Sequence, residues 1–262
     1  MIEHEPPRQS LAVESVAFAG RLLIRWRRHP IVPIQALLFP TFLLVTYYLL
    51  VGKSVVRITG SDSLDGLVPV CAVAGAMFGA LGAGLTIPAE RNSGLLSRFW
   101  TFPVHRASPL TGRLLAEAVR TLVGAALITA VGFALGLRFH GSWLAVVPFL
   151  LLPVAVVIVF ATLVVTVSLR SDGNTLFTWL ATGSIALVFC NSGIATLEAF
   201  PTWLRPIIEY QPMSPIIESM RALTRGDAAA APFVTALLWL VALAAVFVPL
   251  AVRGYRDAAE CG

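Results

Sequence analysis

Residues 143–169 read WLAVVPFLLLPVAVVIVFATLVVTVSL, an apolar run without a single charged side chain. The hydrocarbon core of a bilayer is about 30 Å thick, and about 20 helical residues are needed to cross it. Backbone groups inside hydrocarbon must hydrogen-bond within the protein, and the run lacks the alternating pattern of a barrel strand. The run therefore predicts a transmembrane α-helix.

Five further apolar runs of comparable length lie along the chain. They cover residues 31–51, 66–89, 114–136, 176–197 and 232–252. In the whole sequence 57% of the residues are hydrophobic and 13% are charged, whereas about a quarter of the residues are charged in an ordinary soluble domain. The sequence thus predicts an all-α polytopic membrane protein with six transmembrane helices.

The arginines predict the orientation of these helices, because short cytoplasmic loops carry an excess of Lys and Arg. With the N-terminus inside, the cytoplasmic segments hold twelve arginines and the opposite segments six basic residues, which together with Arg120 in the third run make 19. We therefore expect a multi-pass plasma-membrane protein with both termini in the cytoplasm. Its expected parts are a cytoplasmic tail with an interfacial helix (1–30), a transmembrane domain (31–252) and a cytoplasmic C-terminal tail (253–262).

The segment 11–28 is helical in character but too short and too charged to cross a bilayer. At about 100° per residue, four of its charged side chains share an arc of about 60°. These residues are Glu14, Arg21, Arg25 and Arg28. The pattern predicts a helix lying in the cytoplasmic interface, and a basic anchor without any further role fits it equally well.

A connection expected on the cytoplasmic side, residues 90–112, reads ERNSGLLSRFWTFPVHRASPLTG. Ser93 is a suitable N-cap for a short helix that Pro103 would end. On such a helix Leu95, Phe99 and Phe102 share one apolar face. A short amphipathic helix of this kind suits the docking of another protein, and an interfacial helix that touches only lipid headgroups is the alternative.

The connection expected outside, residues 198–231, is too apolar for a solvated loop and contains four prolines between 201 and 215. Prolines at that density forbid one continuous helix. We expect short helices that enter the outer leaflet, the second capped by Ser214, started by Pro215 and ended near Gly226. A structural lid and a segment that contacts substrate are both compatible with this pattern.

Few side chains in the apolar runs could carry chemistry. Glu117 and Arg120 lie one turn apart and can form an ion pair, for which a shallow interfacial position with snorkelling side chains is the favoured interpretation. Asn191 is a polar interruption late in the fifth run, typical of contacts between helices. The glycine pairs Gly75/Gly79 and Gly132/Gly136 favour close helix packing within one subunit.

The sequence offers no catalytic, metal or cofactor motif. Gly52, Lys53 and Ser54 resemble the end of a phosphate-binding loop, but Tyr47 stands where that motif needs its first glycine. The four histidines lie at no metal-ligand spacing, no Ser, His and acid set is recognisable, and no basic block suggests nucleic acid. Any ATP-driven activity therefore needs a separate subunit.

Two stretches together resemble the permease subunits of type-2 ABC exporters. One is 88–112, with Glu90, Arg91, Gly94, Leu95, Leu96, Pro103 and Val104, which is similar to the cytoplasmic coupling segment of that family. The other runs from Pro201 to Arg221, with Trp203, Leu204, Pro206, Gln211, Pro212, Ser214 and Pro215, and is similar to its external region. Residues 95–122 look most like the daunorubicin/doxorubicin-resistance permeases of mycobacteria.

The resemblance implies six helices per permease, a separate ATPase subunit that holds ATP and magnesium, and a second ABC-2 permease, commonly in a heterodimer. It implies contact with the ATPase through Glu90, Arg91, Gly94, Leu95, Arg98, Phe99 and Trp100. It also implies a pathway or gate formed by Asn191, Phe200, Trp203 and Tyr210. The expected function is export of complex lipids, such as phthiocerol dimycocerosate, or of amphipathic drugs. An intramembrane lipid-modifying enzyme that uses Glu117, Arg120 or Asn191, or a non-transporting membrane scaffold, are the alternatives.

Overall fold

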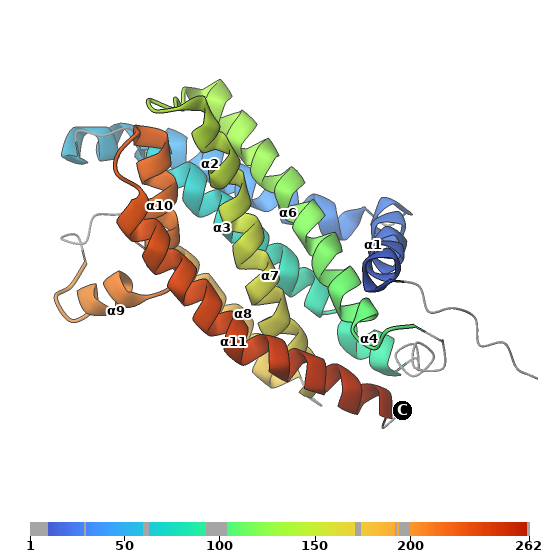
Figure 1. Cartoon of the computed structure of the whole chain (residues 1–262). Coiled ribbons are helices and arrows are strands. Elements are labelled where there is room, and N and C mark those ends of the chain that lie inside the picture. Colours follow the sequence, from blue (N-terminus) through green and yellow to red (C-terminus); the bar gives the residue numbers. More distant parts are fainter. Residues whose placement is uncertain are drawn as a thin grey trace, which may run out of the picture.

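A computed structural model of the chain describes residues 10–28, 30–59, 63–92, 104–170, 174–191, 193 and 200–260. All regular secondary structure within these ranges is helical (Figure 1). The helices are α1 (Leu11–Arg28), α2 (Ile31–Thr59), α3 (Leu64–Gly84), α4 (Ile87–Asn92), α6 (Ser108–Leu135), the 3-10 turn η1 (Trp143–Ala145), α7 (Val146–Arg170), α8 (Asn174–Phe189), α9 (Arg205–Tyr210), α10 (Met213–Arg225) and α11 (Ala230–Glu260). The prediction of an all-α fold is confirmed for the described residues.

Four stretches are long and apolar enough to cross a membrane by length and composition. They are Leu64–Arg91, Ser108–Leu135, Trp143–Leu169 and Ala230–Asp257. Two shorter apolar helices, Leu37–Leu50 and Thr175–Val188, accompany them among the described residues. Four of the six predicted spans thus meet the length criterion, and the crossing of all six remains a prediction.

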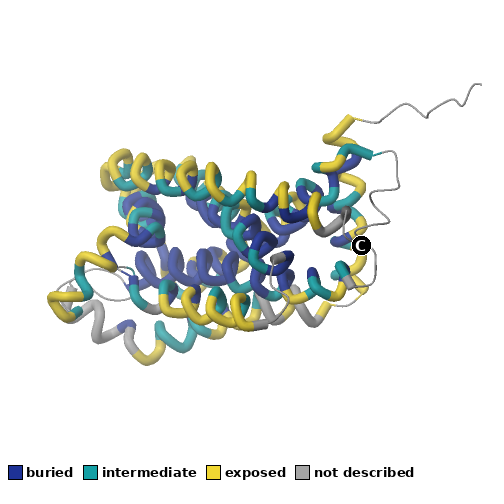
Figure 2. Tube along the Cα trace, turned by 90° about the horizontal axis from the view of Figure 1, so that it is seen from below, coloured by how far each residue is buried: buried dark blue, intermediate teal, exposed yellow. Residues whose placement is uncertain are grey.

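Helix α3 forms the centre of the bundle. It packs against α2, α6, α7 and α10, and Figure 2 shows buried residues gathered in the interior while the outer helices carry exposed ones. Small residues allow this close packing, since a Cβ at Gly75 would meet the ring of Pro40 at 3.2 Å and one at Gly132 would meet Val68 at 2.8 Å. Gly75 and Gly132, the first members of the two predicted glycine pairs, therefore allow close helix packing within the chain.

The bundle has two ends, which we name the α1 end and the α10 end (Figure 1). At the α1 end, the hydroxyls of Ser15 and Thr111 hydrogen-bond at 2.6 Å and join α1 to α6. At the α10 end, the His140 backbone N–H donates to the Thr224 carbonyl at 2.8 Å. The α6–α7 connection and α10 therefore lie together, opposite α1.

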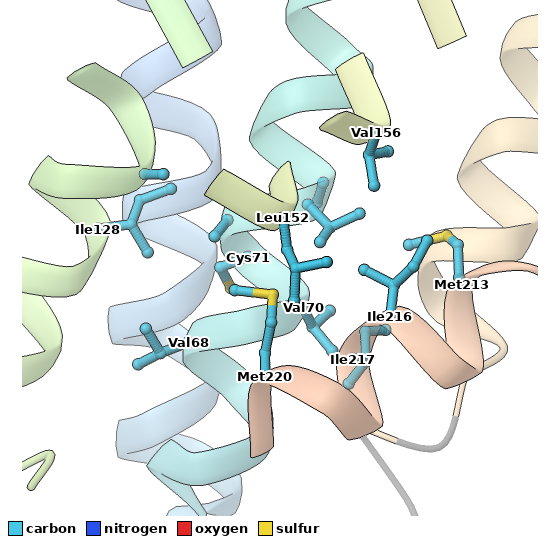
Figure 3. Packing of buried hydrophobic residues seen from close by; sticks show 14 of the residues in the cluster. Val68, Val70, Cys71, Ile128, Leu152, Val156, Met213, Ile216, Ile217 and Met220 are labelled. Atoms are coloured by element: carbon cyan, nitrogen blue, oxygen red, sulfur yellow. The ribbon is translucent and has the colours of Figure 1, made fainter. Parts of the chain in front are cut away.

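Helix α10 is an integral part of the core rather than a surface helix. Met213, Ile216, Ile217 and Met220 are each 3% exposed or less, and they point toward Val70, Cys71, Leu152 and Val156 of α3 and α7 (Figure 3). The apolar face of α10 is thus explained by packing against α3 and α7.

Several helix boundaries differ from the predicted runs. Helix α6 begins at Ser108, before the predicted start of the third run at residue 114, and α8 ends at Phe189, before residue 197. Asn191 accounts for the early end of α8, because its side-chain amide donates to the Val188 carbonyl and accepts from the Gly193 N–H. These bonds satisfy groups that a continued helix would use.

The predicted capping role of Ser214 is wrong. Helix α10 begins at Met213 after Pro212, without a side-chain cap. The Ser214 hydroxyl instead donates to the Ile208 carbonyl at 2.5 Å and ties α10 to α9. The other end of α10 agrees with the prediction, since Gly226 has a φ of 76°, a left-handed conformation that glycine adopts without strain.

Candidate functional site

A group of buried and half-buried charges gathers at the α1 end, just before the 93–103 segment. Glu90 of α4 is its centre and is 8% exposed. Its Oε1 accepts from Arg25 Nη1 of α1 at 2.8 Å, and its Oε2 accepts from Arg113 Nη1 of α6 at 3.3 Å. We name Arg25, Glu90 and Arg113 the Glu90 cluster. One carboxylate therefore joins three helices that are distant in sequence.

The two arginines of the cluster differ in their surroundings. The Arg25 side chain is 52% exposed, whereas that of Arg113 is 6% exposed. Arg113 Nη2 also donates to the Ala83 carbonyl at 3.3 Å and to Thr86 Oγ1 at 2.9 Å, at the turn between α3 and α4. The Arg113 guanidinium is therefore inside the protein and fixes that turn.

Arg91 holds α4 from its other side. Its Nη1 donates at 3.1 Å to the Leu169 carbonyl in the last turn of α7, where a cation also interacts favourably with the helix dipole. The side chains of Glu90 and Arg91, both expected at an ATPase contact, are thus engaged within the chain. Gly94, Leu95, Arg98, Phe99 and Trp100 lie outside the described residues, as does the predicted helix that contains them.

Helix α1 is fastened to the start of α6 by a second carboxylate. Glu14 is 6% exposed, and its Oε2 accepts from the His105 N–H at 2.7 Å and from Ser108 Oγ at 2.5 Å. A negative charge near a helix N-terminus is stabilising. Close approach is needed here, because a Cβ at Gly112 would meet the Phe18 Cβ and the Ser15 carbonyl.

The charge pattern of α1 groups Glu14 with three arginines on one arc and does not predict its contact with the start of α6. A signal was available, because Glu14 is an acidic residue on a helix whose polar side is otherwise arginine. An isolated acidic residue in such a setting can pair with a helix N-terminus as well as with a base. The partner, however, lies more than 90 residues away, which periodicity cannot reveal.

The Glu117–Arg120 pair is present, but it lies under neighbouring helices instead of snorkelling to an interface. Arg120 Nη2 and Nε lie 2.5 and 3.0 Å from Glu117 Oε2. Arg120 is 7% exposed and Glu117 is 1% exposed. Helix α6 begins earlier than predicted, which places the pair two turns and more inside it. The guanidinium packs over Gly79 of α3.

The predicted pathway or gate residues do not form one cluster. Asn191 is fully buried and hydrogen-bonds its own chain segment, while Trp203 and Tyr210 are 69% and 72% exposed. The Phe200 carbonyl accepts from Arg205 Nε at 2.9 Å at the start of α9. Among the described residues, no group of three or more His, Cys, Asp or Glu side chains could hold a metal ion.

Comparison with known proteins identifies the family of the chain. Residues 38–253 match the model of the ABC-2 family transporter proteins. A probable doxorubicin resistance ABC transporter permease protein, DrrC, of Mycobacterium tuberculosis is 33% identical over 91% of this chain and 87% of its own length. The daunorubicin resistance ABC transporter permease protein DrrB1 of Streptomyces coeruleorubidus is 26% identical over 96% and 89%.

A second doxorubicin resistance permease protein of Mycobacterium tuberculosis, DrrB, is 28% identical over 62% of this chain and 56% of its own length. The family match covers the helices that form the Glu90 cluster, apart from α1, and those that form the core. The earlier resemblance, drawn from residues 88–112 and 201–221, is thereby confirmed. The chain belongs to the ABC-2 family of transporter permeases.

Proposed function

We propose that the chain is the permease subunit of an ATP-driven exporter in the plasma membrane, with six transmembrane helices and both termini in the cytoplasm. The Glu90 cluster carries this proposal. It forms a three-helix junction around Glu90, which precedes in sequence the 93–103 segment where a cytoplasmic ATPase would dock. The ATPase, a separate subunit, would hold ATP and magnesium.

The Glu90 cluster would work as a mechanical link. A displacement of the 93–103 segment by the ATPase moves α4 directly, because α4 ends one residue before that segment. Glu90 passes the displacement to α1 and α6, and Arg91 passes it to the end of α7. Packed helices shift as units rather than deforming continuously. A motion that starts in the cytoplasm would therefore reach the core around α3.

A second ABC-2 permease is expected beside this one. Two differently named permeases of Mycobacterium tuberculosis, DrrC and DrrB, both match this chain, which supports a heterodimer of related subunits. The exposed apolar side chains of the outer helices, such as Leu50 at 75% and Leu238 at 65%, suit contact with either lipid or a partner. Membrane lipids would surround the pair.

The proposed substrates are complex lipids, phthiocerol dimycocerosate among them, or amphipathic drugs. Relatives whose names record doxorubicin and daunorubicin resistance support the drug class. The apolar interior supports a hydrophobic cargo, because the buried charges of the described helices are paired within the chain. The rival hypothesis of an intramembrane enzyme places catalysis on Glu117, Arg120 or Asn191, and the proposal leaves these residues structural roles.

The test is purification of the tagged chain from its native membrane, followed by reconstitution in nanodiscs. We expect an ABC ATPase and a second permease to copurify, ATP hydrolysis to respond to lipid or drug, and bound lipid to be found by mass spectrometry. The isolated chain should neither bind ATP nor change any lipid chemically. Turnover of a lipid by the isolated chain would favour the enzyme instead.

A further inference from the structure

A cavity of about 690 Å³ lies between α7, α8 and α11 and is bounded by α9 and α10. Helices α8 and α11 both pack against α7, and the cavity occupies the space between them. Its open side is marked by Trp179 of α8 and Ile207 of α9, which line it and are 71% and 58% exposed. None of the predicted gate residues lines this cavity.

The wall of the cavity is almost entirely hydrocarbon. Ser184 and Gln211 are polar exceptions, and both donate their hydrogen bonds within the chain. Ser184 Oγ donates to the Leu180 carbonyl at 2.7 Å, and Gln211 Nε2 donates to the Cys190 carbonyl at 2.5 Å. No charged side chain is among the described residues that line the cavity. A polar or charged headgroup would therefore lose its hydration there without gaining a partner.

The outer faces of α8 and α11 are apolar as well. Ile185, Leu237 and Val241 on these helices do not line the cavity and are 45%, 52% and 59% exposed. In a membrane these faces contact lipid tails, so the opening leads into hydrocarbon rather than water. Water would not be held in such a space, because a buried water needs two to four polar partners.

We propose that this cavity binds one hydrocarbon chain of a lipid, with the polar head left outside the opening. The volume lies within the range of about 300–1,000 Å³ typical of ligand sites. In a bilayer the favourable free energy of binding comes from close packing. A hydrocarbon chain in the cavity contacts several walls, whereas a chain on an outer helix contacts one. The lining side chains here come from α7, α8, α9, α10 and α11, together with Met77 of α3.

The chain could belong to a transported lipid or to a resident bilayer phospholipid, which share this chemistry. The first source rests on the proposed export function, and the second does not. A hydrocarbon-chain site beside the α9–α10 segment would give that segment contact with the cargo as well as with the core. The substrate class deduced from the cavity is thus defined by its tails and not by its headgroup.

Gly183 provides a direct test. It lines the cavity, and a Cβ added there meets no atom within 4 Å. The substitution Gly183→Phe would add a ring at the cavity wall, with its Cβ in open space, and would replace a poor helix former with a better one. Ile185→Phe is the matched control, because Ile185 is on the same helix, is exposed and does not line the cavity.

The probe is a phosphatidylcholine with a diazirine on one acyl chain, incorporated into nanodiscs with the purified chain. After irradiation, labelled peptides are identified by mass spectrometry. We expect labelling of the α8 and α9 wall in the wild-type chain and an about tenfold loss in Gly183→Phe, equivalent to about 1.4 kcal/mol. Ile185→Phe should be labelled like the wild type. Equal labelling of all three proteins would overturn the proposal.

Two further arms separate the possible occupants. In a complex with ATPase, labelling that falls during ATP turnover identifies a transported chain, and labelling that ignores ATP identifies a resident phospholipid. Both results support the site. Labelling abolished by assembly with the second permease would show that protein side chains fill the cavity, which would refute it. Copurification of the ATPase is measured on the same samples. Failure of the cavity proposal, seen in the labelling, can therefore be distinguished from failure of the proposed export function, seen in the copurification.

Discussion

The guanidinium of Arg120 lies where a side chain at Gly79 would have to stand, so these two residues of α6 and α3 depend on each other. The missing Cβ leaves the room that a large buried cation needs. Glu117 supplies the opposite charge from one turn earlier on α6, with Arg120 Nη2 at 2.5 Å from Glu117 Oε2. A helix crossing and an ion pair are thus set by one glycine.

Gly79→Ala should destabilise the chain, because the new methyl group collides with the Arg120 guanidinium and forces it from its carboxylate. We expect a loss of about 1–3 kcal/mol, the range for overpacking a filled interior. Thermal unfolding in detergent measures it. Gly20→Ala is the control, since a Cβ at Gly20 meets nothing within 4 Å. Equal melting temperatures for both variants would show that Arg120 moves aside at no cost.

The two ion pairs of Glu90 should contribute differently to the stability of the fold. Glu90→Ala removes the ion-pair partner of the buried Arg113, which should cost about 3–5 kcal/mol. Arg25→Ala removes a half-exposed partner and should cost less than about 1 kcal/mol. Chemical denaturation of the purified variants gives both values. A cost for Arg25→Ala as large as that for Glu90→Ala would contradict the difference in burial.

Arg25→Ala should also uncouple the proposed transporter while leaving it folded. The substitution cuts the connection between α1 and α4 but keeps the Glu90–Arg113 pair. Basal ATP hydrolysis of the reconstituted complex should persist, and its stimulation by substrate should fall. Arg21→Ala on the same helix is the comparison, and stimulation reduced equally in both variants would indicate a general effect of charge on α1.

The predicted helix within 93–103 is tested by Leu95→Asp and Phe99→Asp. Each places a carboxylate in a proposed packed contact with the ATPase, where an unpaired charge is costly, so copurification of the ATPase should be lost. Ser97→Asp should be tolerated, since Ser97 lies about 170° from the centre of the face formed by Leu95, Phe99 and Phe102. Expression level controls for membrane insertion. Normal assembly and transport in the Leu95 and Phe99 variants would make this helix a membrane-surface anchor.

The orientation is tested by cysteines at Asp62 and Asp227 in a background with the native cysteines replaced. Both positions should react with an impermeant thiol reagent added to intact cells, because the arginine distribution places them outside. A cysteine at Ser97 should react only after the cells are opened. Labelling of Ser97→Cys from outside would reverse the proposed topology.

The sequence was sufficient to predict most of the helices but not to predict which residues of different helices contact each other. Apolar runs such as 143–169 can satisfy their backbone only as helices, so their existence followed directly, and α1 followed from its charged arc. The depth of Arg113 and Arg120 could not be predicted. Their surroundings include Thr86, in the turn between α3 and α4, and Gly79 of α3, and a pattern within one helix carries no information about its neighbours.

The ends of helices were predicted well where one residue decides locally and poorly where a partner decides. Gly226 ends α10 through its own left-handed conformation, so the prediction held. Ser214 was expected to cap α10, but its hydroxyl bonds Ile208 of α9. The Glu90 cluster could not be predicted for the same reason, because its members come from three separate helices.

The position of α10 in the core sets a condition on biosynthesis. Asp65, which lies in the first turn of the central helix α3 and is 5% exposed, pairs with Arg225 Nε at 3.2 Å across a separation of 160 residues. The apolar face of α10 covers α3 beside this pair. Translation must therefore reach residue 225 before the central helix has its final neighbours. The first helices can insert one by one as they leave the ribosome, but they can become a finished bundle only near the end of synthesis.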